Sequence, residues 1–126
     1  MKRYLGIDYG TKRIGLALGD NLTKIATPFK VVGSLADVVA AIKEEDVDHL
    51  VVGVPLTMNK EKGHMHDKVE EFISDLSDLS GLPIERVDER LSSKAGDALI
   101  GGKKDKAPRD AIAAMLILQS FFDKHD

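Results

Sequence analysis

The sequence predicts an α/β fold, built on a five-stranded mixed sheet that is flanked by helices. Three strand-like stretches follow one another in the first third of the chain, with no helical pattern between them. Two further short apolar runs are each preceded by a segment whose apolar residues recur at helical spacing. Consecutive strands favour antiparallel pairing, and strands reached through a helix favour parallel pairing. We therefore expect three antiparallel strands followed by two parallel ones.

The three N-terminal strands are expected over residues 3–9, 13–19 and 25–32. A Gly-Thr pair at 10–11 marks a tight turn between the first two strands. Glycines inside these strands weaken them but allow another backbone to approach closely. Pro28 favours an edge position for the third strand, because proline cannot donate a hydrogen bond to a neighbouring strand.

The middle of the chain predicts the first crossover. Ser34 is a suitable N-cap for a helix that carries apolar residues at helical spacing. Residues 49–54 form a β-branched run without polar alternation, as in a central parallel strand that is covered on both faces. Residues 56–65 are polar and contain glycine, which predicts a loop.

The C-terminal half continues with a helix around 69–79, closed by a glycine and a proline, and a short strand over 84–88. A short helix is then predicted over 92–100, followed by a basic loop. Residues 110–122 are nearly all apolar, which predicts a helix that is buried on most of its sides.

Length and composition are those of an ordinary globular protein. The chain has 126 residues, which suits one domain over 1–126, with 43% hydrophobic and 31% charged residues. No apolar run is long enough to span a membrane, and the N-terminus lacks the apolar stretch of a signal peptide. The absence of cysteine excludes disulfides, thiol catalysis and Cys-ligated zinc. We expect a cytoplasmic protein.

The formal net charge is −3 at pH 7, whereas proteins that bind nucleic acid are usually basic. Acidic residues gather on one face of the second predicted helix: Asp67, Glu70, Glu71, Asp75 and Asp78. Basic residues cluster near three predicted turns: Lys12, Arg13, Lys60, Lys62, Lys103, Lys104, Lys106 and Arg109. Such a distribution allows local phosphate binding. Solvated surface charge explains each of these side chains equally well.

Asp8 is an unusual residue at its predicted position. It lies within or at the end of the first strand, where aspartate is depleted, and burying a lone carboxylate is costly. A metal ion or a hydrogen-bonded turn would offset that cost. The alternative interpretation is that Asp8 caps the tight turn through its side chain.

Two further acidic positions are candidates for the same site. Asp88 and Glu89 follow the short strand at its carboxyl end, where ligands of α/β sheets gather, although they could equally form an exposed cluster with Arg86 and Arg90. Asp110 opens the last helix, where an acid is favourable to the helix dipole. That helix is otherwise apolar and is expected to pack against the sheet, so its carboxylate can face inward.

Together these positions supply carboxylates from a strand, a strand end and a helix. Oxygen ligand sets with open water positions suit Mg²⁺ or Mn²⁺ rather than zinc. Two such ions can activate a water and stabilise the leaving oxygen in phosphodiester cleavage. The residues alone therefore indicate a metal-dependent phosphodiesterase site as one interpretation beside the local ones given above.

Four sequence blocks resemble, in this order, those of the YqgF family of RNase H-like nucleases: LGIDYGTKRIGLAL, VVGVPL, VDERLSS and DAIAAMLILQSFF. Members of this family are described as Holliday junction resolvases or as nucleases that process pre-16S rRNA. The resemblance covers nearly the whole chain. It implies an RNase H-like fold and an endonuclease that processes the 5′ end of pre-16S rRNA during ribosome biogenesis, or alternatively one that resolves four-way DNA.

The resemblance also implies roles for individual residues. The catalytic and metal-binding acids fall on Asp8, Glu89 and Asp110, with Asp88 as the second choice for the middle position, and the implied metal is Mg²⁺ or Mn²⁺. Substrate contacts are implied for four further residues: Thr11, Lys12, Arg13 and Arg90.

The chain departs from the family pattern in two places. Ser92 and Ser93 stand where the family usually has a pair of threonines, and both retain a hydroxyl group. The 56–65 loop matches the family's turn only loosely, around Asn59 and Gly63, which leaves its role in substrate binding open.

Two other functional classes share parts of this pattern. Proteins of the actin and sugar-kinase type carry a similar first hairpin, but they need a second domain, for which 126 residues leave no room. A non-catalytic nucleic-acid-binding module is the second alternative. Low aromatic content argues against a stacking platform for single strands, and three retained acids would repel phosphate without a metal. Within the nuclease class, RNA or branched DNA as substrate, and a monomer or homodimer, stay open.

Overall fold

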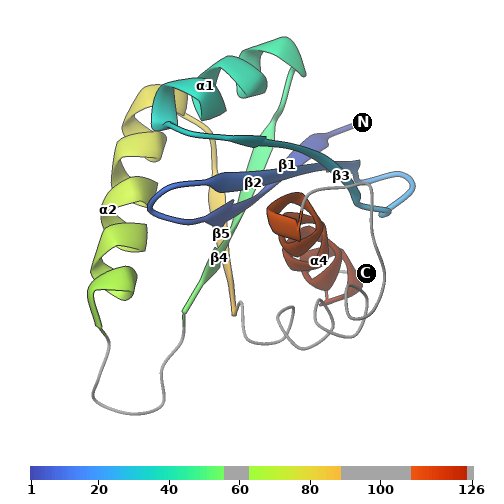
Figure 1. The fold of residues 1–126 in the computed structure, drawn as a ribbon. Helices are drawn as coiled ribbons and strands as arrows, with labels where there is room; N and C mark the ends of the chain where they lie inside the picture. The colour runs from blue at the N-terminus through green and yellow to red at the C-terminus, as the bar shows by residue number, and fades with distance from the viewer. Residues whose placement is uncertain (56–62, 89–108, 125–126) are drawn as a thin grey trace.

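The computed structural model describes residues 1–55, 63–88 and 109–124 (Figure 1). Its centre is a sheet in the order β3-β2-β1-β4-β5. The strands are β1 (Arg3–Tyr9), β2 (Ile14–Asp20), β3 (Thr27–Val32), β4 (His49–Val54) and β5 (Ile84–Asp88). β1, β2 and β3 pair antiparallel, whereas β4 pairs parallel with both β1 and β5. The predicted five-stranded mixed sheet is confirmed, and the strand that contains Pro28 lies at an edge as predicted.

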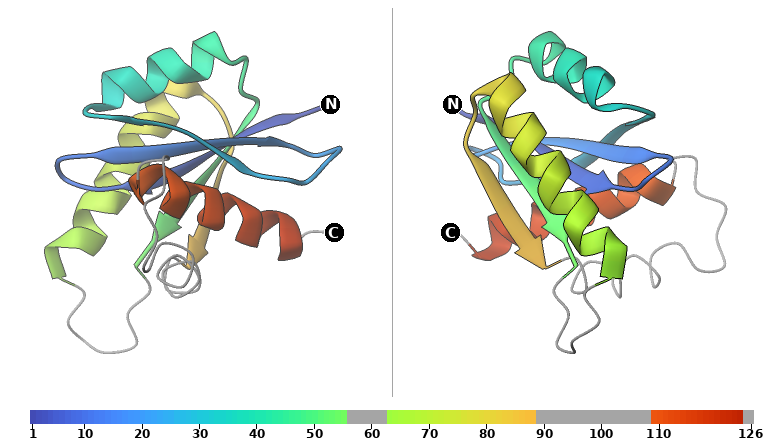
Figure 2. Two further views of the ribbon diagram at one scale, coloured as in Figure 1. Left: turned by 45° about the vertical axis from the view of Figure 1, so that its right-hand side comes forward. Right: turned by 90° about the vertical axis from the view of Figure 1, so that its left-hand side faces the viewer.

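Helices cover both faces of this sheet (Figure 2). α1 (Leu35–Glu44) and α2 (Gly63–Ser80) lie on one face, and α4 (Arg109–Lys124) crosses the other. Ser34 caps α1 as predicted, because its side chain accepts a hydrogen bond from the backbone N–H of Asp37. α2 begins at Gly63, inside the segment predicted as a loop, and the helix predicted over 92–100 lies outside the described residues.

Strand alternation divides the core into two layers. On β1, Leu5 and Ile7 are fully buried under α1 and α2, in a cluster that includes Val38, Phe72 and other residues of these helices. Tyr4 points to the opposite face and packs with Phe121 and Phe122 of α4. Within each strand of this region, successive residues therefore alternate between the α1–α2 face and the α4 face.

α4 packs directly against glycines of β1 and β2. A Cβ on Gly6 would lie 2.7 Å from Cβ of Leu118, and one on Gly19 would lie 2.7 Å from the Phe122 ring, both closer than real contacts allow. A Cβ on Gly15 would collide with the backbone of Asp110. The predicted close approach of another backbone to the strand glycines is thus confirmed, and that backbone belongs in part to the first turn of α4.

The last helix is less enclosed than its composition predicts. Seven of its residues are buried: Ala111, Ile112, Ala114, Ile117, Leu118, Phe121 and Phe122. Ala113, Met115 and Leu116 remain partly exposed, because α4 buries the side that faces the sheet. The prediction of burial on most sides was wrong to that extent.

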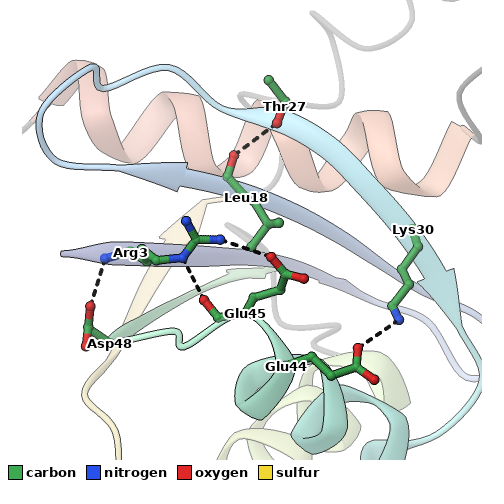
Figure 3. Close-up of polar contacts among 7 residues, drawn as sticks. All are labelled: Arg3, Leu18, Thr27, Lys30, Glu44, Glu45 and Asp48. Carbon is green, nitrogen blue, oxygen red and sulfur yellow. Dashed lines mark hydrogen bonds and ion pairs between the residues drawn. The ribbon is translucent and has the colours of Figure 1, made fainter. Parts of the chain in front are cut away.

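A polar cluster fixes the amino end of β1 (Figure 3). Asp8 lies near the other end of this strand. The Arg3 side chain donates to the backbone oxygen of Glu45 at 2.6 Å and to its carboxylate at 3.0 Å. The backbone N–H of Arg3 donates to Asp48 at 2.9 Å, and the N–H of Asp48 returns a bond to the Arg3 carbonyl. These bonds tie the end of α1 and the start of β4 to β1.

Across the three described stretches, no helix is both long enough and apolar enough to cross a membrane.

Candidate functional site

The candidate site lies where the parallel strands end. β1, β4 and β5 run in the same direction, so their carboxyl ends meet at one edge of the sheet. Asp8 is the last residue but one of β1, and Asp88 is the last residue of β5. Both are half-buried, and the strand residues before them, Ile7 and Val87, are buried. This edge is where α/β sheets usually bind ligands.

Asp8 belongs to the face of the sheet that α4 covers. Tyr4 and Gly6 of β1 contact α4, and Asp8 is the next residue with the same parity. Gly6 lies beneath Ala114 and Leu118, so Asp8 lies one step further along β1, toward the beginning of the helix.

Gly15 brings the beginning of α4 to Asp8. Asp8 and Gly15 are directly opposite each other in the β1–β2 register and therefore share a face. The backbone of Asp110 packs directly on Gly15, in the space that any side chain would fill. Two of the three predicted acids, more than a hundred residues apart in sequence, are thus close neighbours.

A second glycine flanks Asp8 on its other side. Ile7 is in register with Val52 of β4, so the position beside Asp8 is Gly53, and Gly53 in turn is in register with Val87 of β5. No side chain therefore rises from β4 next to the Asp8 carboxylate. The sequence identified neither Gly15 nor Gly53 as part of a site, although glycine within a strand is the available signal for such an opening.

Arg13 joins this group through an ion pair. Its Nε lies 2.9 Å from Oδ2 of Asp110. Arg13 immediately precedes β2, and this contact places its side chain on the α4 side of the sheet. The Arg13 side chain is 73% exposed and that of Asp110 29% exposed, so the pair is open to solvent from the side of the arginine.

A surface hollow next to this ion pair is lined by Arg13, Val31, Arg109 and Asp110. The two arginines give it a positive wall, and the backbone N–H groups of the first turn of α4 add to the positive potential. A phosphate group fits this environment better than it fits the hollow at Thr11, described next.

The other predicted substrate residues occupy different surroundings. Thr11 lines a hollow between the β1–β2 hairpin and α2, where Lys68 is accompanied by Glu71 and Asp75. Lys12 is exposed at the hairpin tip. Glu89 and Arg90 lie outside the described residues, as does most of the 56–65 loop. The structure therefore brings Arg13 to Asp110 and leaves Thr11 in a different hollow.

Asp88 faces the opposite side of the sheet from Asp8. It is in register with Val54, a member of the core under α1 and α2. Arg86, two residues earlier, points to the same side and binds the Glu70 carboxylate through two hydrogen bonds of 3.1 and 2.9 Å. Its hydrogen bond to Glu70 raises the pKa of the Arg86 guanidinium. Asp88 thus faces α2, on the other side of the sheet from Asp110.

The described residues supply part of a binding site for a divalent cation. Asp8 and Asp110 provide carboxylate oxygens, which Mg²⁺ and Mn²⁺ prefer, beside an open position at Gly53. Within the described stretches, no group of three or more acidic or imidazole side chains has the geometry of a metal site. The third acid predicted for the site, Glu89, falls outside those stretches.

Comparison with known sequences assigns the chain to one family. The chain matches the family model described as "RuvX: Holliday junction resolvase" over residues 2–124. A protein of Endomicrobium trichonymphae named "Putative pre-16S rRNA nuclease" is 36% identical, with 98% of this chain and 96% of the relative covered. A protein of the same name from Methylobacillus flagellatus is 38% identical, with 94% and 89% covered.

Comparison with solved structures gives the same fold. Thermus thermophilus RuvC, in complex with a Holliday junction substrate, has a TM-score of 0.65 at 16% identity, covering 99% of this chain and 96% of RuvC. The Fowlpox virus resolvase, also in complex with junction DNA, has a TM-score of 0.58 at 12% identity and covers 98% of each chain. These likenesses confirm the predicted RNase H-like fold. The chain therefore belongs to the RuvX family, the YqgF family of the sequence resemblance, and is a nuclease.

Proposed function

We propose that this protein is a divalent-metal-dependent endonuclease that hydrolyses phosphodiester bonds at the 5′ end of pre-16S rRNA, in the cytoplasm, during ribosome biogenesis. The observation that carries the proposal is the convergence of Asp8 and Asp110 beside Arg13 on one face of the sheet. The relatives named as pre-16S rRNA nucleases, which are covered over nearly their full length, support the choice of substrate.

We assign the third carboxylate to Glu89 rather than Asp88. Val87 packs with α4 residues, and Asp88 is in register with the core on the other face. Asp88 therefore lies on the opposite face from Asp8 and Asp110, which argues against Asp88 as the third ligand. The family resemblance implies Glu89 for this role, and Glu89 lies outside the described residues.

In the proposed mechanism, Asp8, Glu89 and Asp110 would hold Mg²⁺ or Mn²⁺. When bound, the cation supplies a water of lowered pKa and neutralises charge that builds up on the phosphate. Arg13 and Arg109 hold the flanking phosphate through charge-assisted hydrogen bonds. The packing of Asp110 on Gly15 fixes the position of its carboxylate relative to Asp8.

A four-way DNA junction is the second candidate substrate. The description of the matching family model as a Holliday junction resolvase favours it. The resolvases solved with junction DNA share the fold of this chain. A resolvase needs two matched sites, so this alternative requires a symmetric dimer.

A direct comparison of substrates tests the proposal. The purified protein is incubated with Mn²⁺ and either a precursor RNA containing the 16S 5′ end or a four-way DNA junction of equal length. We expect cleavage of the RNA near the mature end and little cleavage of the junction. Asp8→Asn serves as the inactive control, and Asp78→Asn, which removes an exposed carboxylate of α2, serves as the matched active control.

The reverse preference, with paired cuts in the junction, would replace the proposed RNA substrate by branched DNA. Binding of either nucleic acid without any cleavage would instead identify a non-catalytic module.

A further inference from the structure

Asp110, one of the proposed metal ligands, forms an ion pair with a side-chain cation. The Arg13 Nε is 2.9 Å from Oδ2 of Asp110. Local geometry builds this contact, because a Cβ on Gly10 would lie 2.6 Å from the Arg13 carbonyl oxygen and would open the tight turn. The glycine at position 15 then lets the Asp110 backbone approach β2 two residues beyond Arg13.

This ion pair can be broken at a small cost in stability. The Arg13 side chain is 73% exposed, and exposed ion pairs add little stability because water and salt compensate for their loss. The contact is made at Nε of Arg13, on a side chain that is otherwise largely in solvent. The arginine can leave Asp110 without disturbing the core beneath it.

We propose that Arg13 acts as an exchangeable placeholder: it neutralises Asp110 in the metal-free protein, gives way when the divalent cation binds, and is thereby released to bind the substrate phosphate. Two cations near one carboxylate repel each other, so Arg13 and the metal compete for Asp110. Arg13 also lines the hollow that Arg109 shares, so a phosphate-binding position lies within its reach. Metal and nucleic acid then favour each other's binding, because each stabilises the released arginine.

This inference rests on the proposed metal site, and its first test is the affinity for Mn²⁺ alone. Titration calorimetry would measure Mn²⁺ binding to the wild type and to Arg13→Gln. We expect the variant to bind Mn²⁺ about three- to tenfold more tightly, as expected from removing one unit charge a few ångströms away. Lys30→Gln is the matched control: Lys30 pairs with Glu44 on the α1 side at 3.6 Å, so its loss changes net charge without touching Asp110 (Figure 3).

Unchanged or weaker Mn²⁺ binding by Arg13→Gln would overturn the placeholder role, because a positioning arginine would lower the metal affinity when removed. Equal tightening in Lys30→Gln would also overturn it, since the effect would then be one of net charge. If Asp8→Asn leaves Mn²⁺ binding unchanged, the proposed metal site itself fails, which separates the two failures.

A second test measures RNA binding in metal-free buffer by fluorescence anisotropy. Asp110→Asn should release Arg13 without a metal and tighten binding of the labelled precursor RNA about threefold or more, roughly the effect of one freed charge. The same substitution in an Arg13→Gln background should have a clearly smaller effect, because no arginine remains to be released. Equal effects in both backgrounds would contradict the exchange.

Discussion

At the scale of single residues, the alternation of side chains along each strand decides which acids face the same side of the sheet. Asp8 shares a face with Gly15, on which Asp110 packs, whereas Asp88 is in register with Val54 on the opposite face. An aspartate within a strand is therefore informative only when its face is known. The same criterion argues against Asp88 as a ligand of the candidate site.

Substitution of the two adjacent acids tests this criterion. We expect Glu89→Gln to lower Mn²⁺-dependent cleavage by about a hundredfold or more, because it removes a proposed metal ligand. Asp88→Asn should retain most of the activity, since Asp88 faces α2. Initial rates on the same RNA, with thermal unfolding as a check of folding, measure both. The opposite ranking would move the third carboxylate to Asp88.

The sequence could propose candidate site residues, but it could not show which of them lie close together. Asp8 and Asp110 could each be explained locally, as a turn cap and as a helix-dipole acid, and only the sheet register brings them together. The ion pair between Arg13 and Asp110 joins a hairpin to a distant helix, so no local pattern predicts it. Thr11 and Arg13, two residues apart, were predicted to share one role, but they line different hollows.

At the scale of elements, the site depends on how closely α4 approaches β2. The helix lies on Gly6, Gly15 and Gly19, and the closest contact is at its first turn. Sequence analysis could predict that strand glycines admit a backbone, but not which one, because that choice is made by tertiary packing. The start of α2 at Gly63 was missed for a related reason: a glycine is a poor helix former, so the local pattern predicts a loop.

Gly15→Ala tests the link between packing and site. The added methyl group collides with the Asp110 backbone, so we expect a loss of about 1–3 kcal/mol in the free energy of unfolding, as for other overpacked cores. Cleavage should fall further, by about a hundredfold at temperatures where the variant is folded, because Asp110 is displaced from Asp8. Denaturant unfolding and initial rates are the two measurements.

Gly33→Ala is the matched control for this change. A Cβ at Gly33 meets nothing within 4 Å, so its stability should stay within about 0.5 kcal/mol of the wild type. Full activity in Gly15→Ala would show that the approach of α4 does not position the site.

At the scale of the whole molecule, the two faces of the sheet differ in charge. The exposed acids of α2 lie on the α1–α2 side: Asp67, Glu71, Asp75 and Asp78. The hollow beside Asp110 has Arg13 and Arg109 on the α4 side. A net charge of −3 is therefore compatible with a nucleic acid that approaches from the α4 side. Composition could not show this, because it does not say which face each helix covers.

The central claim is that Asp8 is a ligand of the divalent cation that phosphodiester cleavage requires. The most direct measurement is the rate of Mn²⁺-dependent cleavage of the precursor RNA by Asp8→Asn, compared with the wild type at equal folded fraction. The account predicts that the rate falls by about three orders of magnitude or more, while the thermal unfolding midpoint without metal stays close to that of the wild type. Cleavage at near wild-type rates by a folded Asp8→Asn protein would contradict it.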